Sequence, residues 1–343
     1  DALDQQILAL VNERADCAQQ VAEIKRAAGE TANFARPERE ARLLRELTEA
    51  NPGPLASDAV TRIFREIISG CLALEQPLRV AYLGPAGTFT QAAVQKHFGG
   101  SVGTQPLGAI DEVFREVAAG SAHFGVVPVE NSTEGMVTHT LDVFAESQLR
   151  ICGEILLRIH HHLVTNAGAL ASVTCVYAHQ QALAQCREWL DANLAHAQRV
   201  AVNSNAEAAQ RAAAEPAHAA IASAMAAEIY GLECLFERIE DEPDNTTRFL
   251  VLGHHDVAPS GDDKTSLLLS ARNRPGALFH LIQPLADHGI DMTRLESRPT
   301  RGRLWEYVFF VDIAGHADSE AVRPALAALN EEAALCRVLG SYP

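Results

Sequence analysis

Apolar residues recur at helical spacing through the first 76 positions. They mark one face of a long first helix at Leu3, Ile7, Leu10, Val11, Val21 and Ile24. We expect this helix to end between Gly29 and Asn33. Pro37 occupies the first turn of a second helix, and Ser57 or Asp58 can cap a third. Three helices bury little core in a monomer, so the pattern predicts a helical bundle completed by a second subunit.

After Pro77 the pattern changes to short apolar runs separated by helical stretches. The runs that are typical of buried strands are 78–83, 124–129, 151–157, 172–177, 199–202 and 219–221. Helical patterns separate them at 88–98, 110–119, 180–194, 205–214 and 223–230. This alternation predicts an open, mostly parallel α/β sheet in two lobes. Such folds bind ligands at the carboxyl ends of strands or in the cleft between lobes.

A polar stretch at 254–263 predicts a linker to a third part of the chain. The elements expected after it are strands at 264–271, 290–297, 305–313 and 335–339, with helices at 275–288 and 319–330. This βαββαβ order is that of a ferredoxin-like α+β domain. The sequence therefore predicts a multidomain protein: an all-α domain at 1–76, a two-lobed α/β domain like that of periplasmic binding proteins at 78–253, and the α+β domain at 264–343.

Length and composition agree with several soluble domains. The chain has 343 residues, 48% of them hydrophobic and 21% charged, which is typical of two or three globular domains. Its formal net charge of −16 disfavours nucleic acid and anionic membranes as partners. No apolar stretch is long enough for a membrane span or a signal segment, and we expect a cytoplasmic protein. The chain opens at Asp1 within a helical pattern, so we expect native residues ahead of it.

Neither the cysteines nor the histidines indicate a metal site. The seven cysteines are scattered and form no CxxC pair, which favours reduced thiols over disulfides or zinc. A histidine run at 160–162 raises the alternative of a metal site. Strand alternation would send neighbouring side chains to opposite faces, and no further ligand residue lies close in sequence. We expect no metal and no other cofactor.

Several charged residues of the helical segment fall on facing positions. Arg14 and Lys25 are eleven residues apart, close to three full turns, so both project from one helix face. Arg39 and Glu40 open the second helix, and Glu75 lies near the end of the third. Spacing alone favours solvated salt bridges. The alternative is a pocket that binds a small dianion.

Residues 1–76 resemble the all-helical chorismate mutase family, whose members form an intertwined dimer. The matching segments are Ala2-Leu-Asp4, Leu10, Glu13-Arg14, Lys25, Pro37, Arg39-Glu40, Ile67-Ile68, Cys71 and Glu75. The resemblance implies that Arg14 and Lys25 bind the carboxylates and ether oxygen of chorismate and that Glu40 holds its hydroxyl. Arg36, Arg39, Cys71 and Glu75 complete the expected binding set. Cys71 stands where the family has serine, and Arg36 where some members have an acidic residue. A further arginine, donated across the dimer, is expected before Asp1.

The resemblance gives Lys25 and Glu75 the catalytic roles. In the family, glutamine or glutamate at the position of Glu75 donates a hydrogen bond to the breaking ether bond. A carboxylate cannot donate, so Glu75 has to be protonated in its pocket. The rearrangement needs no nucleophile, and conformational restraint and charge placement would supply the rate.

Three turns of the second segment each lead from a strand into polar, hydroxyl-rich sequence. They are Gly84-Pro-Ala-Gly87-Thr-Phe-Thr90, Pro128-Val-Glu-Asn-Ser-Thr-Glu-Gly135 and Ala222-Ser-Ala224. The first lacks the glycines and lysine of nucleotide-binding loops. Single turns of this kind are mostly helix caps, whose N–H groups can also bind carboxylates. Three of them after strands of one sheet, beside the Asn245–Phe249 segment, indicate a shared anion site.

Residues 78–253 resemble the prephenate dehydratase family through Gly84-Pro-x-Gly87-Thr-Phe, the 127–135 block and the Thr247-Arg-Phe249 signature. The resemblance implies loss of CO2 and of the ring hydroxyl from prephenate, which gives phenylpyruvate. Thr247 would be essential, as the hydrogen-bond donor or acid to the departing hydroxyl, and Phe249 would pack. The groups expected to hold the carboxylates are Thr88, Asn131, Ser132, Thr133, Ser223 and Arg248.

Two motifs of the third segment resemble the ligand-contacting motifs of ACT regulatory domains. On their own, Arg274-Pro-Gly-Ala-Leu-Phe279 is a turn and Leu295-Glu-Ser-Arg-Pro299 a strand edge. The resemblance implies that phenylalanine binds between paired domains and inhibits. Gly276 would let the backbone approach the ligand, and Glu296 would meet its ammonium group. The expected contact set is Gly276, Ala277, Leu278, Glu296, Ser297 and Arg298.

Together the three resemblances imply a bifunctional enzyme of phenylalanine biosynthesis. Its substrates would be chorismate and prephenate, its effector L-phenylalanine, and its assembly a homodimer or higher homo-oligomer. Two alternatives remain open. A non-catalytic amino-acid sensor could combine a two-lobed binding fold with an ACT module, and a monofunctional dehydratase could carry the helical segment as a dimerisation arm.

Overall fold

The computed structural model describes residues 1–27, 35–272, 274–299 and 307–343. The helical segment forms the three expected helices, α1 (Ala2–Ala27), α2 (Pro37–Glu49) and α3 (Ser57–Glu75). The predicted end of the first helix, at Gly29 to Asn33, lies outside the described residues. The cap of α3 differs from the prediction, since Ala56 is the N-cap residue and no side chain caps the helix.

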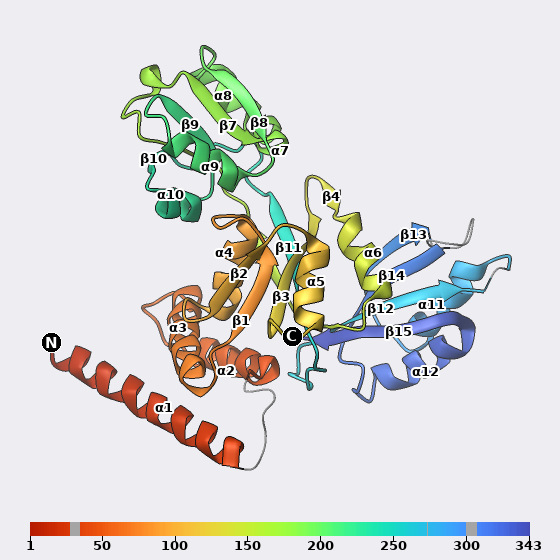
Figure 1. Cartoon of the computed structure of the whole chain (residues 1–343). Coiled ribbons are helices and arrows are strands. Elements are labelled where there is room, and N and C mark those ends of the chain that lie inside the picture. The colour runs from red at the N-terminus through yellow and green to blue at the C-terminus, as the bar shows by residue number, and fades with distance from the viewer. Residues whose placement is uncertain (28–34, 273, 300–306) are drawn as a thin grey trace.

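Helix α1 makes few contacts with the rest of its own chain. It packs partly against α3, only Ala22 on it is buried, and it extends away from the body of the molecule (Figure 1). Its apolar face is therefore open to solvent: Leu3, Ile7, Leu10 and Ile24 are between 59% and 73% exposed. Without a partner, this helix leaves unburied the stripe that the sequence marks as core.

The first lobe of the α/β part surrounds a mixed sheet with the strand order β2-β1-β3-β11-β5, and β4 pairs with β3. The elements of this lobe are β1 (Arg79–Leu83), α4 (Phe89–Phe98), β2 (Gly103–Leu107), α5 (Ile110–Ala118), β3 (Phe124–Asn131), β4 (Gly135–Met136), α6 (Thr138–Glu146), β5 (Arg150–Arg158) and β11 (Thr246–Gly253).

The second lobe is built around a sheet with the order β10-β6-β9-β7-β8. Its elements are β6 (His162–Thr165), β7 (Cys175–His179), α7 (Gln180–Gln185), α8 (Arg187–Asn193), β8 (Gln198–Val202), α9 (Asn205–Ala213), β9 (His218–Ala222), α10 (Ala224–Tyr230) and β10 (Glu233–Phe236). The helix expected over 180–194 is interrupted at Cys186, between α7 and α8. The chain crosses between the lobes twice, from β5 to β6 and from β10 to β11 (Figure 1).

The two-lobed α/β organisation is confirmed, but the prediction of a mostly parallel sheet is wrong. Strand β11 runs antiparallel to both β3 and β5, and β6 runs antiparallel to β9. The reason is the second crossing: after the second lobe is complete, the chain returns and inserts β11 into the middle of the first sheet. The turns before α4 and α10 follow β1 and β9, which belong to two different sheets and not to one sheet as expected.

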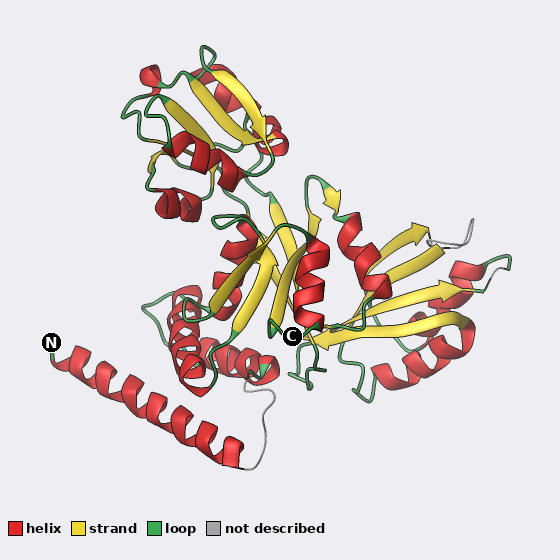
Figure 2. Cartoon of the chain, in the orientation of Figure 1, coloured by secondary structure: helices red, strands yellow, loops and turns green. Residues whose placement is uncertain are grey.

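The last part has the predicted βαββαβ order in an antiparallel sheet, β13-β14-β12-β15 (Figure 2). Its elements are β12 (Lys264–Ala271), α11 (Ala277–Asp287), β13 (Met292–Pro299), β14 (Tyr307–Ala314), α12 (Val322–Glu332) and β15 (Ala333–Tyr342). The predicted start of the third strand, at 305, lies outside the described residues.

The inner strand β12 of this sheet is buried on both faces. Leu267 and Leu269 of β12 point to α11 and α12, whereas Leu268 between them joins the core of the first lobe. Alternation along a strand sends neighbours to opposite faces. Phe310 and Leu339 also enter the first-lobe core, so the third domain is fused to the first lobe through shared hydrophobic packing.

Two candidate active sites and a candidate regulatory surface

The three N-terminal helices enclose a pocket of about 210 Å³. All seven residues that the sequence assigned to the helical site line it: Arg14, Lys25, Arg36, Arg39, Glu40, Cys71 and Glu75. They come from α1, from the start of α2 with the residue before it, and from the second half of α3. The structure thus supports the pocket interpretation over that of dispersed surface salt bridges.

Positive charge dominates the described lining of this pocket, with four cationic residues against two carboxylates. Burial raises the pKa of Glu75, while the nearby Lys25 and Arg39 oppose the shift. Burial also raises the pKa of Glu40, against the opposing charge of Arg65, whose Nε lies 3.6 Å from the Glu40 carboxylate. The cations of this pocket suit a small dianion, and burial shifts Glu75 towards its neutral, proton-donating form.

A larger cleft of about 1110 Å³ separates the two lobes of the α/β part. Thr88 and Asn131 of the first lobe, Ser223 of the second, and Thr247 at the start of β11 all line it. Thr88 is the N-cap residue of α4, and its hydroxyl donates to the carbonyl of Leu83.

The lobes touch directly at one edge of this cleft. The Ser223 hydroxyl accepts from the N–H of Ala226, which caps α10, and donates to the carbonyl of Gly87 at 3.0 Å. Gly87 has a φ of +88°, and a Cβ there would lie 3.1 Å from the Cα of Ala226. Only glycine combines this conformation with so close an approach.

Asn131 determines the orientation of the Thr247 hydroxyl. Its Nδ2 donates to Thr247 Oγ1 at 2.8 Å and to Asn245 Oδ1 at 2.7 Å. Since the Thr247 oxygen accepts from Asn131, the Thr247 proton remains free to donate elsewhere. Thr247 lines the cleft, so the arrangement suits hydrogen-bond donation to a group bound there.

A closed ring of hydrogen bonds holds Asn131 in place. Thr133 Oγ1 donates to Asn131 Oδ1 at 2.6 Å, and Gln185 Nε2 donates to Thr133 Oγ1 at 3.1 Å. Asn245 Nδ2 completes the ring by donating to Gln185 Oε1 at 3.1 Å. Gln185 belongs to α7 of the second lobe, so the ring joins the lobes beside Thr247. Gln185 could not be predicted from the sequence, because no local motif marks it.

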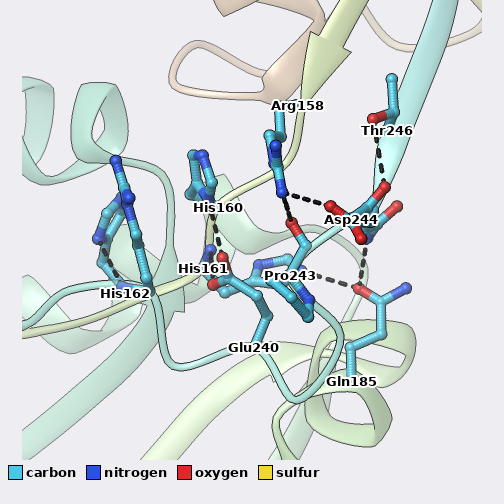
Figure 3. Close-up of polar contacts among 11 residues, drawn as sticks. Arg158, His160, His161, His162, Gln185, Glu240, Pro243, Asp244 and Thr246 are labelled. Atoms are coloured by element: carbon cyan, nitrogen blue, oxygen red, sulfur yellow. Dashed lines mark hydrogen bonds and ion pairs between the residues drawn. The ribbon is translucent and has the colours of Figure 1, made fainter.

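The histidine run lies where the chain crosses between the lobes (Figure 3). His161 Nε2 lies 2.8 Å from Gln185 Oε1, which accepts; Nε2 therefore carries the proton. Burial lowers the pKa of His161, so the ring is neutral. His160 Nδ1 lies 2.7 Å from the buried carboxylate of Glu240, which also accepts from the His161 N–H. Within the described residues, no group of three metal-ligating side chains occurs.

Three of the predicted cleft residues have other roles. Ser132 and Thr133 do not line the cleft; the Ser132 hydroxyl accepts from the N–H of Thr246, and Thr133 belongs to the ring described above. Arg248, which the resemblance assigned to substrate binding, does not line the cleft either. Its side chain leaves the opposite face of β11 from Thr247 and contacts Glu154 and Asp312 at 2.7 Å each. Phe249 packs in the core, as expected, and also forms cleft wall.

The described lining of the cleft contains no lysine or arginine. A carboxylate there would be held by hydroxyls, side-chain amides and the backbone N–H groups that open α4, which carry partial positive charge. His139, His161 and His179 also line the cleft. The two candidate active sites therefore differ in kind, one rich in fixed cations and the other built from neutral donors.

The predicted regulatory residues lie at two places on the third domain. Gly276, with a φ of +72°, precedes α11, and Ala277 and Leu278 open that helix. Glu296, Ser297 and Arg298 lie on β13, an edge strand of the sheet. Arg298 is also tied to the first lobe, since its Nη2 lies 3.0 Å from the carboxylate of Asp142 on α6.

All seven cysteines are free. Within the described part of the chain, no helix has both the length and the hydrophobicity needed to cross a bilayer.

Comparisons with known proteins match each part separately. The family model for chorismate mutase type II matches residues 1–76, that for prephenate dehydratase matches residues 80–257, and that for the ACT domain matches residues 265–331.

Relatives of full length carry all three parts. A bifunctional chorismate mutase/prephenate dehydratase of Stutzerimonas stutzeri is 56% identical over 347 residues, covering 100% of this chain and 95% of the relative. One of Aquifex aeolicus is 44% identical, covering 100% of this chain and 95% of the relative. A solved structure of prephenate dehydratase from Arthrobacter aurescens in complex with L-Phe is 37% identical with a TM-score of 0.71, and the match covers 77% of this chain and 89% of that one. The chain belongs to the bifunctional chorismate mutase/prephenate dehydratase family.

Proposed function

We propose that this chain converts chorismate to prephenate in the helical pocket and prephenate to phenylpyruvate in the interlobe cleft. The observation that carries the proposal is the presence of both sites in one chain: the pocket around Arg14, Lys25 and Glu75, and the cleft in which Asn131 orients Thr247. The relatives that match the whole chain are named for both activities.

In the helical pocket, the reaction is an intramolecular rearrangement in which one C–O bond breaks as one C–C bond forms. Arg14 and Arg39 bind the two carboxylates and hold the substrate compact, so part of the entropic barrier is met by binding. Lys25 and protonated Glu75 donate hydrogen bonds to the ether oxygen, where negative charge develops. No proton is lost or gained overall.

In the cleft, prephenate loses its ring carboxylate as CO2, and the electrons of that bond enter the ring. The ring becomes aromatic as the C–O bond to its hydroxyl breaks, and the departing oxygen takes up one proton, which comes from the solvent overall, to leave as water. Thr247 donates a hydrogen bond to this oxygen. A threonine hydroxyl is a weak acid, but aromatisation drives the step, so a positioned donor suffices.

We further propose that L-phenylalanine inhibits the enzyme by binding to the ACT domain at Gly276–Leu278 and Glu296–Arg298. The Arthrobacter aurescens relative was solved in complex with L-Phe, and the motifs at these positions follow the ACT pattern. Inhibition requires that phenylalanine bind one conformation of the protein better than another.

The exposed apolar stripe of α1 supports a homodimer as the assembly of this chain. Pairing of two α1 helices would cover Leu3, Ile7 and Leu10 and would bring a second chain to the edge of the helical pocket. The seven free cysteines support a reducing, cytoplasmic location.

The deciding experiment supplies chorismate to the purified protein and follows prephenate and phenylpyruvate, with and without L-phenylalanine. We expect both products in sequence and less phenylpyruvate when phenylalanine is present. A protein that consumes prephenate but not chorismate would be a monofunctional dehydratase with a dimerisation arm. A protein that binds phenylalanine without turnover would be a sensor.

A further inference from the structure

Arg248 connects the strand that carries Thr247 to the ACT domain. Thr247 lines the cleft, whereas Arg248 leaves the other face of β11 and is only 9% exposed. The pairing of β11 with β3 contains a bulge between Arg248 and Phe249, and bulges of this kind re-aim side chains beside active sites. Two neighbouring residues of one strand therefore face two different domains.

The Arg248 guanidinium closes a ring of hydrogen bonds with the ACT sheet. Its Nη1 lies 2.7 Å from Asp312 Oδ2 on β14, and its Nη2 donates to Tyr342 Oη on β15 at 3.0 Å. Ser266 Oγ donates to Asp312 Oδ1 at 2.5 Å, so it accepts from the Tyr342 hydroxyl, 2.7 Å away. Every proton in this ring has one assigned acceptor, and all four residues are buried.

The charges around the ring balance. Arg248 Nε also lies 2.7 Å from Glu154 on β5, whose second oxygen lies 2.6 Å from Lys264 Nζ on β12. Two cations thus meet two carboxylates, one of each from either domain. Burial would lower the pKa of Arg248, but Tyr342, Asp312 and Glu154 together raise it. The guanidinium stays charged, and separating it from Asp312 would leave a buried charge unpaired.

A second ion pair reaches the same position from the edge strand β13. Arg294 Nη1 lies 2.8 Å from Glu130 Oε2, and Glu130 pairs with Arg248 in the register of β3 and β11. Glu130 also precedes Asn131, which orients Thr247. The strand that carries Glu296 and Ser297 is therefore tied to the residues around the Thr247 hydroxyl.

We propose that Arg248 is a positioning residue that couples the ACT domain to Thr247, so that a ligand bound at β13 and α11 alters dehydratase turnover by moving β11. This inference rests on the proposed function, because it takes the cleft as the dehydratase site and L-phenylalanine as the effector. Hydrogen bonds weaken steeply with distance and angle. A shift of β14 or β15 therefore moves β11 with it, because breaking the hydrogen bonds of the buried ring would cost more free energy than moving the strand.

The test compares Tyr342→Phe with Ser341→Ala in the full chain. Tyr342→Phe removes one hydroxyl from the ring and keeps the aromatic packing. Ser341 is the neighbouring buried residue, and within the described residues its hydroxyl bonds only inside the ACT domain, to Thr265 and to the N–H of Ala317. The dehydratase kcat and KM are measured with and without saturating L-phenylalanine, and phenylalanine binding is measured separately by equilibrium dialysis.

We expect Ser341→Ala to keep the wild-type ratio of uninhibited to inhibited kcat/KM. In Tyr342→Phe this ratio should fall several-fold towards one, from a wild-type value in the typical allosteric range of about 5–150-fold, while phenylalanine still binds. Any change in the uninhibited reaction should appear in kcat and not in KM, because the ring does not touch the cleft. An unchanged ratio in Tyr342→Phe, or an equal loss in both variants, would overturn the inference.

A second variant, Arg248→Gln with Asp312→Asn, removes one positive and one negative charge together. The remaining charges, on Lys264 and Glu154, still balance each other. We expect this variant to lose inhibition as Tyr342→Phe does. Mutase turnover of the same protein serves as the control for folding. Retained inhibition in this variant would contradict the inference. Wild-type protein that does not convert prephenate would overturn the proposed function, and this inference with it.

Discussion

The side-chain amide of Asn131 donates a 2.8 Å hydrogen bond to the hydroxyl oxygen of Thr247. Because an N–H group can only donate, this contact leaves the threonine proton to point elsewhere. Asn131 is itself fixed through Thr133 and Gln185, so a residue of the second lobe helps set the direction in which Thr247 donates.

Thr247→Ala should abolish dehydratase turnover. We expect kcat to fall by at least about 10²-fold, the usual contribution of one positioned proton donor, while mutase turnover stays near normal. Thr247→Ser, which keeps the hydroxyl, should retain much of the dehydratase activity. Loss of both activities in the alanine variant would indicate a folding defect, and the role of Thr247 would be unsupported.

Asn131→Asp should impair the dehydratase by reversing one hydrogen bond. A carboxylate at this position accepts the Thr247 proton instead of donating to its oxygen, so the hydroxyl turns away from the substrate. We expect kcat to fall about 10–100-fold, the equivalent of about 1.5–3 kcal/mol, with a smaller change in KM. Steady-state kinetics with prephenate measure this. Asn166→Asp, at an exposed asparagine of the second lobe that does not line the cleft, serves as the control, and an equal effect there would argue against the role of Asn131.

Mutase activity should depend on the protonation of Glu75. Burial raises the pKa of this group, and only the protonated form donates to the ether oxygen. Mutase kcat/KM should therefore be highest below the raised pKa and decline as pH rises through it. In Glu75→Gln the amide donates at every pH, so the profile should flatten. The control is Glu49→Gln, an exposed carboxylate on α2, which should keep the wild-type profile; a declining profile in Glu75→Gln would contradict the assignment.

Ile7→Asp should separate assembly from folding. Ile7 is 59% exposed in the single chain, so its replacement changes the stability of the monomer by only about 0.5 kcal/mol or less. In a dimer formed through α1, the same change buries a charge in the interface. We expect sedimentation velocity to show dissociation and mutase turnover to fall more than dehydratase turnover. Gln19→Asp, at an exposed polar position of α1, should remain assembled.

Local periodicity was sufficient to place two cations of the helical segment on one face, whereas the pocket itself was predicted from the resemblance to the chorismate mutase family. Residues eleven apart on α1 share a face by helix geometry alone, so Arg14 and Lys25 could be placed together before any tertiary structure was known. The βαββαβ order of the third domain was equally readable, because its apolar patterns repeat at the spacing of each element.

Long-range pairing was not predictable in the same way. Strand β11 follows the second lobe in sequence but inserts between β3 and β5, and no local pattern specifies which strands it joins. Gln185 and His161 reach the cleft from segments without a motif. Arg248 stands beside Thr247 in the signature. Their roles differ because neighbouring side chains leave opposite faces of the strand, and each face meets a different part of the protein.

The sequence by itself determined the three parts, their element types and the residues of the helical pocket, because each depends on contacts within a few turns or on a motif read directly. The tertiary structure decided which strands are neighbours, which lobe supplies each cleft residue, and that Arg248 faces the ACT domain rather than the substrate. These features depend on pairing between segments that can lie more than a hundred residues apart, such as Asn131 and Asn245, which are 114 residues apart, and that pairing is selected by the packing of the whole chain.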